Sequence, residues 1–237
     1  IADLKAIQDE LRVRLDRYGF DYAEHISEGN LEYFPAALEH HNIEYTIKGA
    51  VDFLDLVPES KPFFLWAAFT TTHGPHEPID SGDVRNTPEG YSEDHLGLMP
   101  DRSEYMDRNK QWRNIMKETV LWMDGGIGVI LDKLKEKGEL DNTLIVFLSD
   151  QQNAGKASPY ERGANIPFIA RWPEVIDAGT SCETLIDVTD MAATFIDVSR
   201  AKVLNGMVLD GKSILPVWLG ETNILKTAIL TESGFSK

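Results

Sequence analysis

The feature that most constrains the fold is the apolar run 144–148, which ends abruptly in Ser149, Asp150 and Gln151 and is followed, after a polar turn, by Lys156. Bulky apolar residues followed at once by oxygen donors and a cation are typical of a buried strand that leads into a functional site. In open α/β sheets the ligand crevice lies beyond the carboxyl ends of parallel strands. We therefore expect the residues after this run to carry chemistry.

The composition excludes several classes of function. The 237 residues include 39 acidic and 23 basic side chains, a formal net charge of -16, which argues against nucleic acid as a partner because phosphate binding relies on clustered Lys and Arg. No apolar run approaches the roughly 18 residues of a membrane span, so we expect no membrane segment. The single cysteine, Cys182, excludes an intrachain disulfide and a thiolate zinc site. We expect it to be a buried small hydrophobic residue.

Helices are predicted where apolar residues recur at spacings of three and four. This period covers 3–18, 42–57, 107–137 and a segment that begins at Thr189 or Asp190 as its cap. Asn42 is expected to cap the second of these helices. The glycines Gly125, Gly126 and Gly128 weaken the third, so we expect close backbone packing or a bend there.

Extended segments alternate with these helices. Residues 62–70 indicate an aromatic-rich buried strand, 144–148 a second strand and 166–171 a short third one. Residues 74–105 show no clear period, and a connection of about 30 residues is usually functional or disordered. The alternation predicts a layered α/β fold with a mostly parallel sheet.

Four stretches of the sequence resemble the type I sulfatases of the alkaline phosphatase superfamily. They are 62–75 (PFFLWAAFTTTHGP), 138–150 (GELDNTLIVFLSD), 156–173 (KASPYERGANIPFIARWP) and 209–216 (LDGKSILP), in the order and spacing of the family. The resemblance implies a three-layer alkaline phosphatase-like fold with a mostly parallel central sheet. Residues 1–237 would then be one partial catalytic domain, with a loop excursion at 74–105 and the start of a C-terminal subdomain near 220–237.

The resemblance implies that Asp150 and Gln151 are metal ligands. A carboxylate and an amide carbonyl are hard oxygen donors, which suit Ca²⁺ or Mg²⁺. Many relatives carry Asn or His in place of Gln151, and this departure leaves the ion open, with Ca²⁺ favoured. The alternative is that Asp150 only caps the turn after its strand.

The resemblance also assigns the other site residues. Lys156 matches the lysine that contacts the sulfate ester, where an ammonium can neutralise charge on the nonbridging oxygens. His73 matches the histidine that protonates the leaving alcohol or holds the sulfate, and imidazole changes charge near neutral pH. We expect His76 and Arg162 to contact substrate. The alternatives are a solvated lysine and a histidine that only stabilises its loop.

Members of this family attack sulfur with a formylglycine, which is made from Cys or Ser in a Cys/Ser-x-Pro-x-Arg motif, and this motif is not in the sequence. We therefore expect the chain to be the middle and later part of a sulfatase, with formylglycine supplied by a missing N-terminal segment. Because Ca²⁺ seeks about six to eight oxygens, the chain as it stands should bind metal weakly and turn over little.

The sequence thus predicts a sulfuric ester hydrolase that acts on a sulfated carbohydrate or aryl sulfate. In the complete enzyme the hydrated aldehyde would attack sulfur while Ca²⁺ stabilises the oxyanion. One alternative is a phosphodiesterase or phosphonate hydrolase of the same superfamily, which a Thr nucleophile would favour. Another is a noncatalytic sulfated-glycan binding protein. The resemblance implies a periplasmic, extracellular or lysosomal location.

Overall fold

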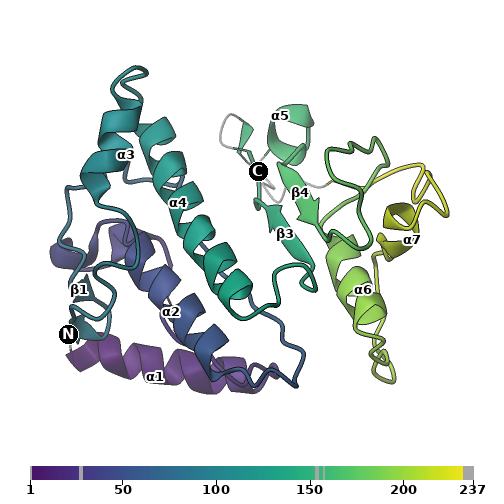
Figure 1. The fold of residues 1–237 in the computed structure, drawn as a ribbon, viewed down its shortest axis with the longest axis horizontal. Coiled ribbons are helices and arrows are strands. Elements are labelled where there is room, and N and C mark those ends of the chain that lie inside the picture. Colours follow the sequence, from purple (N-terminus) through teal and green to yellow (C-terminus); the bar gives the residue numbers. More distant parts are fainter. Residues whose placement is uncertain (1, 27–28, 153–154, 157, 232–237) are drawn as a thin grey trace, which may run out of the picture. The chain divides into compact units, whose positions relative to one another are not determined.

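The computed structural model describes residues 2–26, 29–152, 155–156 and 158–231, which fall into two compact units divided between Leu140 and Asp141 (Figure 1). The helices of the first unit are α1 (Ala2–Asp16), η1 (Leu31–Tyr33), η2 (Ala36–Leu38), α2 (Ile43–Leu56), α3 (Arg102–Asn109) and α4 (Ile115–Glu136). Its strands are β1 (Asn86–Thr87) and β2 (Gly90–Tyr91). None of the described helices is long and apolar enough to cross a membrane.

The first two predicted helices are confirmed, with ends within two residues of the prediction. α1 is followed by Gly19 at φ +90°, a left-handed conformation that glycine adopts without strain. At the start of α2 the Asn42 side chain accepts a hydrogen bond from the Tyr45 backbone N–H at 3.1 Å. The cap satisfies one of the amides that a helix leaves without a partner in its first turn.

The long helix predicted over 107–137 is instead two helices, α3 and α4. The chain leaves α3 at Asn109 and begins α4 after Asn114, whose side chain accepts from the Lys117 N–H at 3.2 Å. A short polar side chain that bonds to the backbone competes with helix continuation. The apolar periodicity does not report such a bond, so it could not show the break. The expected close packing at the glycines is confirmed for Gly125, against Tyr105, and for Gly126, against Ile43 and Ile47.

The hydrophobic core of the first unit lies between α2 and α4, which run side by side in Figure 1. Its buried members are Ile43, Ile47, Ile79, Met99, Tyr105 and Trp122. The Arg102 guanidinium lies 4.4 Å from the Trp122 ring centroid and makes two hydrogen bonds to Glu44, at 2.9 and 3.0 Å. The pairing lets a charged group sit at the edge of this core.

The predicted strand 62–70 is extended but is not paired with another strand of the described residues. Its exposure alternates, and Phe64 and Trp66 are 49% and 72% exposed. The prediction of a buried strand is therefore wrong for this structure. Composition predicts an extended backbone, but a strand also requires a partner, which lies elsewhere in sequence.

Residues 74–105, expected to be a functional or disordered excursion, form an ordered loop that packs on the first unit. The segment contains the β1–β2 hairpin and ends in the first turn of α3. Ile79, Thr87, His95 and Met99 are buried within it. These buried side chains follow no regular period, so periodicity could not predict this packing.

The second unit contains β3 (Ile145–Leu148), α5 (Glu161–Ala164), β4 (Phe168–Arg171), α6 (Thr189–Val198) and α7 (Leu215–Trp218). Both predicted strands are present, but β3 pairs antiparallel with β4, with Leu148 opposite Phe168. The mostly parallel sheet is not found in the described residues, where the β1–β2 pair is antiparallel as well. The alternation of helices and strands remains consistent with an α/β fold.

Three local expectations for this unit are corrected. β3 is half-buried rather than buried, with Leu148 37% exposed. Cys182 is exposed, in an irregular segment where its thiol lies 3.0 Å from the Thr184 hydroxyl. α6 has Val188 at its cap position. Asp190 lies inside its first turn, where it accepts hydrogen bonds from the backbone N–H of Asp187, just before the helix, and from that of Lys212.

Candidate active site

The turn that carries His73 follows the extended segment 62–70 in the first unit. The turn is closed by the His73 backbone N–H, which donates to the Thr70 carbonyl at 3.1 Å. The half-buried His73 ring has its Nδ1 3.0 Å from the Gly74 carbonyl. A carbonyl only accepts, so Nδ1 carries the proton of the neutral ring and Nε2 is the nitrogen that can gain and deliver a second one.

A second histidine, His41, lies behind this turn and is only 6% exposed. Its Nδ1 lies 2.8 Å from the Thr70 hydroxyl oxygen, and its Nε2 lies 3.0 Å from the His73 carbonyl oxygen. Burial lowers the pKa of His41. Sequence reasoning missed this residue, because a histidine next to a helix cap gives no sign that it contacts a turn more than 25 residues away.

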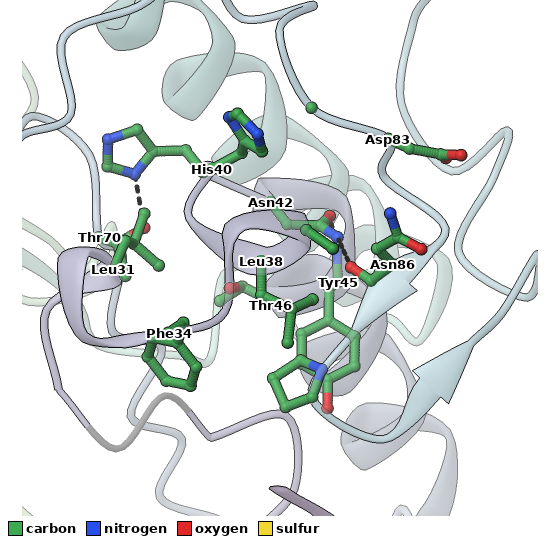
Figure 2. A pocket seen from close by; sticks show the side chains of 14 residues that line it. Leu31, Phe34, Leu38, His40, Asn42, Tyr45, Thr46, Thr70, Asp83 and Asn86 are labelled. Carbon is green, nitrogen blue, oxygen red and sulfur yellow. Dashed lines mark hydrogen bonds between the residues drawn. The ribbon is translucent and has the colours of Figure 1, made fainter. Parts of the chain in front are cut away.

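The His76 side chain is exposed, one residue before Glu77, which pairs with His40. A pocket of about 540 Å³ of empty space, part of it open to solvent, lies next to His40. His40, His41, Asn42 and Thr70 are part of its lining. Figure 2 shows the Asn42 amide directed at Asn86 and a dashed hydrogen bond that ends on Thr70.

Asp150 and Gln151 lie just beyond the end of β3 in the second unit. Asp150 is exposed, and its Oδ1 accepts from the Gln151 backbone N–H at 2.9 Å while its Oδ2 accepts from the Gln151 side-chain amide at 3.2 Å. The two side chains are therefore neighbours, as a shared cation site requires. The same bonds also fit a carboxylate that caps its turn.

These two residues suit a hard divalent cation by the chemistry of their donors, since both offer oxygen. They supply only part of a coordination shell. The described residues contain no group of three or more His, Cys, Asp or Glu that could hold a metal ion.

Lys156 and Arg162 belong to the turn that follows, and both side chains are exposed. Gly155 lies so close to the Arg162 backbone, and Gly163 to the carbonyls of Gly155 and Ser158, that a Cβ at either glycine would overlap with them. The tight turn holds the backbone before Lys156 against that of Arg162. Both cations are therefore presented by one compact loop.

The structure brings four predicted site residues together in pairs within the second unit. Asp150 contacts Gln151, and Lys156 shares a turn with Arg162. His73 and His76 belong to the first unit. That all six residues form one site stays a prediction.

Comparison with known proteins identifies the family. The model of the family described as Sulfatase matches residues 17–200. Among curated proteins, the extracellular sulfatase SULF-1 homologue of Drosophila melanogaster is 27% identical over 236 residues, which covers 89% of this chain and 20% of the relative. An N-acetylglucosamine-6-O-sulfatase of Bacteroides thetaiotaomicron is 37% identical over 106 residues, 42% of this chain and 19% of the relative.

Among solved structures, Ps i-CgsB superposes with a TM-score of 0.61 at 27% identity, over 76% of this chain and 39% of that one. The chain thus spans about a fifth of the length of these curated relatives and about two fifths of this solved one. Because the family match covers most of the chain and every predicted site residue, the chain belongs to the sulfatase family, within the alkaline phosphatase-like superfamily.

Proposed function

We propose that this chain is part of a sulfuric ester hydrolase that acts on a sulfated carbohydrate. The observation that carries the proposal is the family match over residues 17–200, which includes all six predicted site residues. The substrates named for relatives support the substrate class, since these relatives include an N-acetylglucosamine-6-O-sulfatase and an ulvan-active sulfatase. One crystal structure of Ps i-CgsB holds a neocarrahexaose.

His73 would act as the general acid. Its Nδ1 donates to the Gly74 carbonyl, so a proton gained by the ring is held at Nε2. From there it can pass to the alcohol oxygen that leaves when the sulfate ester breaks. A sugar alkoxide is a poor leaving group, and proton donation of this kind typically contributes about 10² to 10⁴ in rate.

The cations of the second unit would bind the sulfate. Lys156 would neutralise the nonbridging oxygens as the bond to the leaving oxygen breaks. Arg162, on the same turn, has a planar fork of donors that can bind a sulfate or carboxylate of the substrate in two places. His76 would contact the sugar. The exposure of these three side chains supports a role toward a ligand.

Asp150 and Gln151 would hold a divalent cation, with Ca²⁺ favoured over Mg²⁺ because Ca²⁺ accepts mixed carboxylate and carbonyl ligands in flexible geometry. When bound, such an ion neutralises charge on the sulfate group, and a formylglycine from outside this chain would be the nucleophile. The role of this chain is to place a carboxylate and an amide next to each other at the end of β3, with Asp150 Oδ2 3.2 Å from Gln151 Nε2.

We also propose that residues 1–237 form one partial catalytic domain in a larger three-layer fold with a mostly parallel central sheet. The superposition on Ps i-CgsB supports this fold. The extended segment 62–70 supports it too, since Phe64 and Trp66 expose apolar surface that a further layer would cover.

The test is an assay of the complete protein with its own nucleophile segment and added Ca²⁺. We expect inorganic sulfate to be released from sulfated oligosaccharides, and Lys156→Ala to lower kcat/KM about 100-fold. Lys202→Ala, a change at another exposed lysine, is the matched control and should leave the rate unchanged. Cleavage of a phosphodiester but no sulfate ester would favour the phosphodiesterase. Binding of sulfated glycan without cleavage would favour the noncatalytic alternative.

A further inference from the structure

We propose that His41 is a positioning residue that fixes the turn carrying His73, and so sets where the general acid lies. The inference rests on the proposed function. His41 touches neither substrate nor the reacting atoms in this scheme. It acts through the backbone of the residues that do.

The geometry of the turn carries the inference. The four residues 70–73 are closed by the bond from the His73 N–H to the Thr70 carbonyl, at 3.1 Å. The His41 ring contacts both ends of this turn, the Thr70 hydroxyl at 2.8 Å and the His73 carbonyl at 3.0 Å. One rigid imidazole therefore spans the turn and joins its first residue to its last.

The hydrogen-bond roles of His41 follow from its partners. The His73 carbonyl can only accept, so His41 Nε2 carries the ring proton and donates it. His41 Nδ1 is then the acceptor for the Thr70 hydroxyl. Burial lowers the pKa of His41, which favours this neutral ring and outweighs the opposing effects of the His73 and Pro75 carbonyls and of the Glu77 carboxylate. Both ring nitrogens are thus used by the same turn.

The neighbours of His41 hold it in place. Asn42 caps α2 and donates to the Val84 carbonyl at 2.7 Å. On the other side His40 pairs with Glu77, just beyond the turn. Ile43 follows, with 1% of its surface exposed in the core. Residues 40–43 are therefore fixed to the loop and to the core, and His41 contacts the turn from a rigid position.

The consequence for catalysis follows from the bond within the turn. His73 Nδ1 is 3.0 Å from the Gly74 carbonyl, so the ring orientation depends on the backbone that His41 holds. A misplacement of about 1 Å in a reacting group can lower a rate about 100-fold. Loss of His41 should therefore weaken proton donation, and it should slow the reaction only for substrates whose leaving group needs a proton.

The experiment uses the complete protein with its matured nucleophile and Ca²⁺, and two substrates. One is 4-nitrophenyl sulfate, whose phenolate leaves without a proton. The other is a glucosamine 6-O-sulfate, whose sugar oxygen needs a proton in order to leave. Two variants separate the two hydrogen bonds of the His41 ring. In His41→Gln the side-chain amide reaches the position of Nε2 and keeps the bond to the His73 carbonyl. In His41→Asn the amide reaches only the position of Nδ1 and keeps the bond to the Thr70 hydroxyl.

We expect His41→Asn to lower kcat about tenfold on the glucosamine sulfate, with KM within twofold, and to change the aryl sulfate rate little. His41→Gln should recover most of the loss. Thr70→Val, which deletes one hydroxyl and keeps the imidazole, should lower kcat about threefold with the same dependence on the leaving group.

The control is His95→Asn. His95 is 1% exposed and its Nε2 also bonds to a backbone carbonyl, that of Val84, rather than to the turn. This change should lower stability without any dependence on the leaving group. An active wild type in which His41→Asn and Thr70→Val slow both esters equally overturns the inference alone. A wild type that releases sulfate from neither ester overturns the proposed function and the inference with it.

Discussion

The Lys226 ammonium lies 2.8 Å from Oδ1 of Asp190, a carboxylate with no exposed surface. Asp190 also accepts the backbone N–H groups of Asp187, at 2.9 Å, and Lys212, at 2.7 Å. One buried side chain in the first turn of α6 thus joins three segments of the second unit. Removing a partner from a buried ion pair leaves an uncompensated charge, which is strongly destabilising.

We therefore predict that Asp190→Ala lowers the free energy of unfolding by about 3 to 5 kcal/mol. The measurement is denaturant unfolding followed by circular dichroism. Asp197→Ala, at an exposed position of the same helix, is the control and should change stability by less than about 0.5 kcal/mol. Equal effects of the two changes would contradict the role assigned to Asp190.

The ion pair between Asp187 and Lys226 leads to a prediction about stability at acidic pH. Burial alone would raise the pKa of Asp187, but the hydrogen bonds from Lys226 and Thr189 outweigh it and the pKa is lowered from 3.8. A carboxyl whose pKa is lowered in the folded state contributes stability above its ordinary pKa and loses it as pH falls through the folded value. Asp187→Asn should thus destabilise at pH 7, and the difference from wild type should shrink as pH falls below 3.8. Thermal unfolding at both pH values measures this difference, and a constant difference would contradict it.

Local chemistry accounts for what could be predicted from the sequence. The Asn42 helix cap depends on residues near in sequence, and it is observed. The close approach at Gly126 depends on the lack of a side chain there, and it is observed as well. The contact of His41 with His73 spans 32 residues, and no pattern signals it. The antiparallel direction of β4, and the absence of 62–70 from both sheets of the described residues, likewise depend on pairing between segments far apart in the sequence. Periodicity reports which face is apolar, but not which segment will cover it.

The glycines of α4 provide a matched pair of substitutions. A Cβ on Gly126 would lie 2.9 Å from Ile43 Cγ2 and 3.0 Å from Ile47 Cδ1, whereas one on Gly128 would meet nothing within 4 Å. We predict that Gly126→Ala destabilises the protein by about 1 to 3 kcal/mol through overpacking. Gly128→Ala should stabilise it by about 0.5 to 1 kcal/mol, because alanine is the better helix former. Thermal melts of both variants test this, and a shift of the same sign in both would contradict the packing.

The contact of Arg102 with Glu44 and Trp122 predicts that lysine cannot replace this arginine. Arg102 makes two parallel bonds to the Glu44 carboxylate, and its guanidinium lies over the indole ring. A lysine keeps the charge but loses the planar fork. We expect Arg102→Lys to lower the free energy of unfolding by about 2 kcal/mol. Arg108→Lys, at an exposed position of α3, should have no measurable effect on stability. A comparable loss of stability in Arg108→Lys would mean that the effect comes from lysine in α3 and not from the contact with Glu44 and Trp122.

The neighbouring side chains of Asp150 and Gln151 make a prediction about metal that does not depend on turnover. If they hold the cation in the complete protein, Ca²⁺ should raise its melting temperature, because a ligand that binds only the folded state stabilises it. Asp150→Ala removes a charged ligand and should abolish most of this rise, and Gln151→Ala, which removes a neutral one, should reduce it. Asp177→Ala, at another exposed aspartate of the second unit, should keep the full rise. A rise that survives Asp150→Ala would exclude this carboxylate from the cation site and leave it as the cap of the turn after β3.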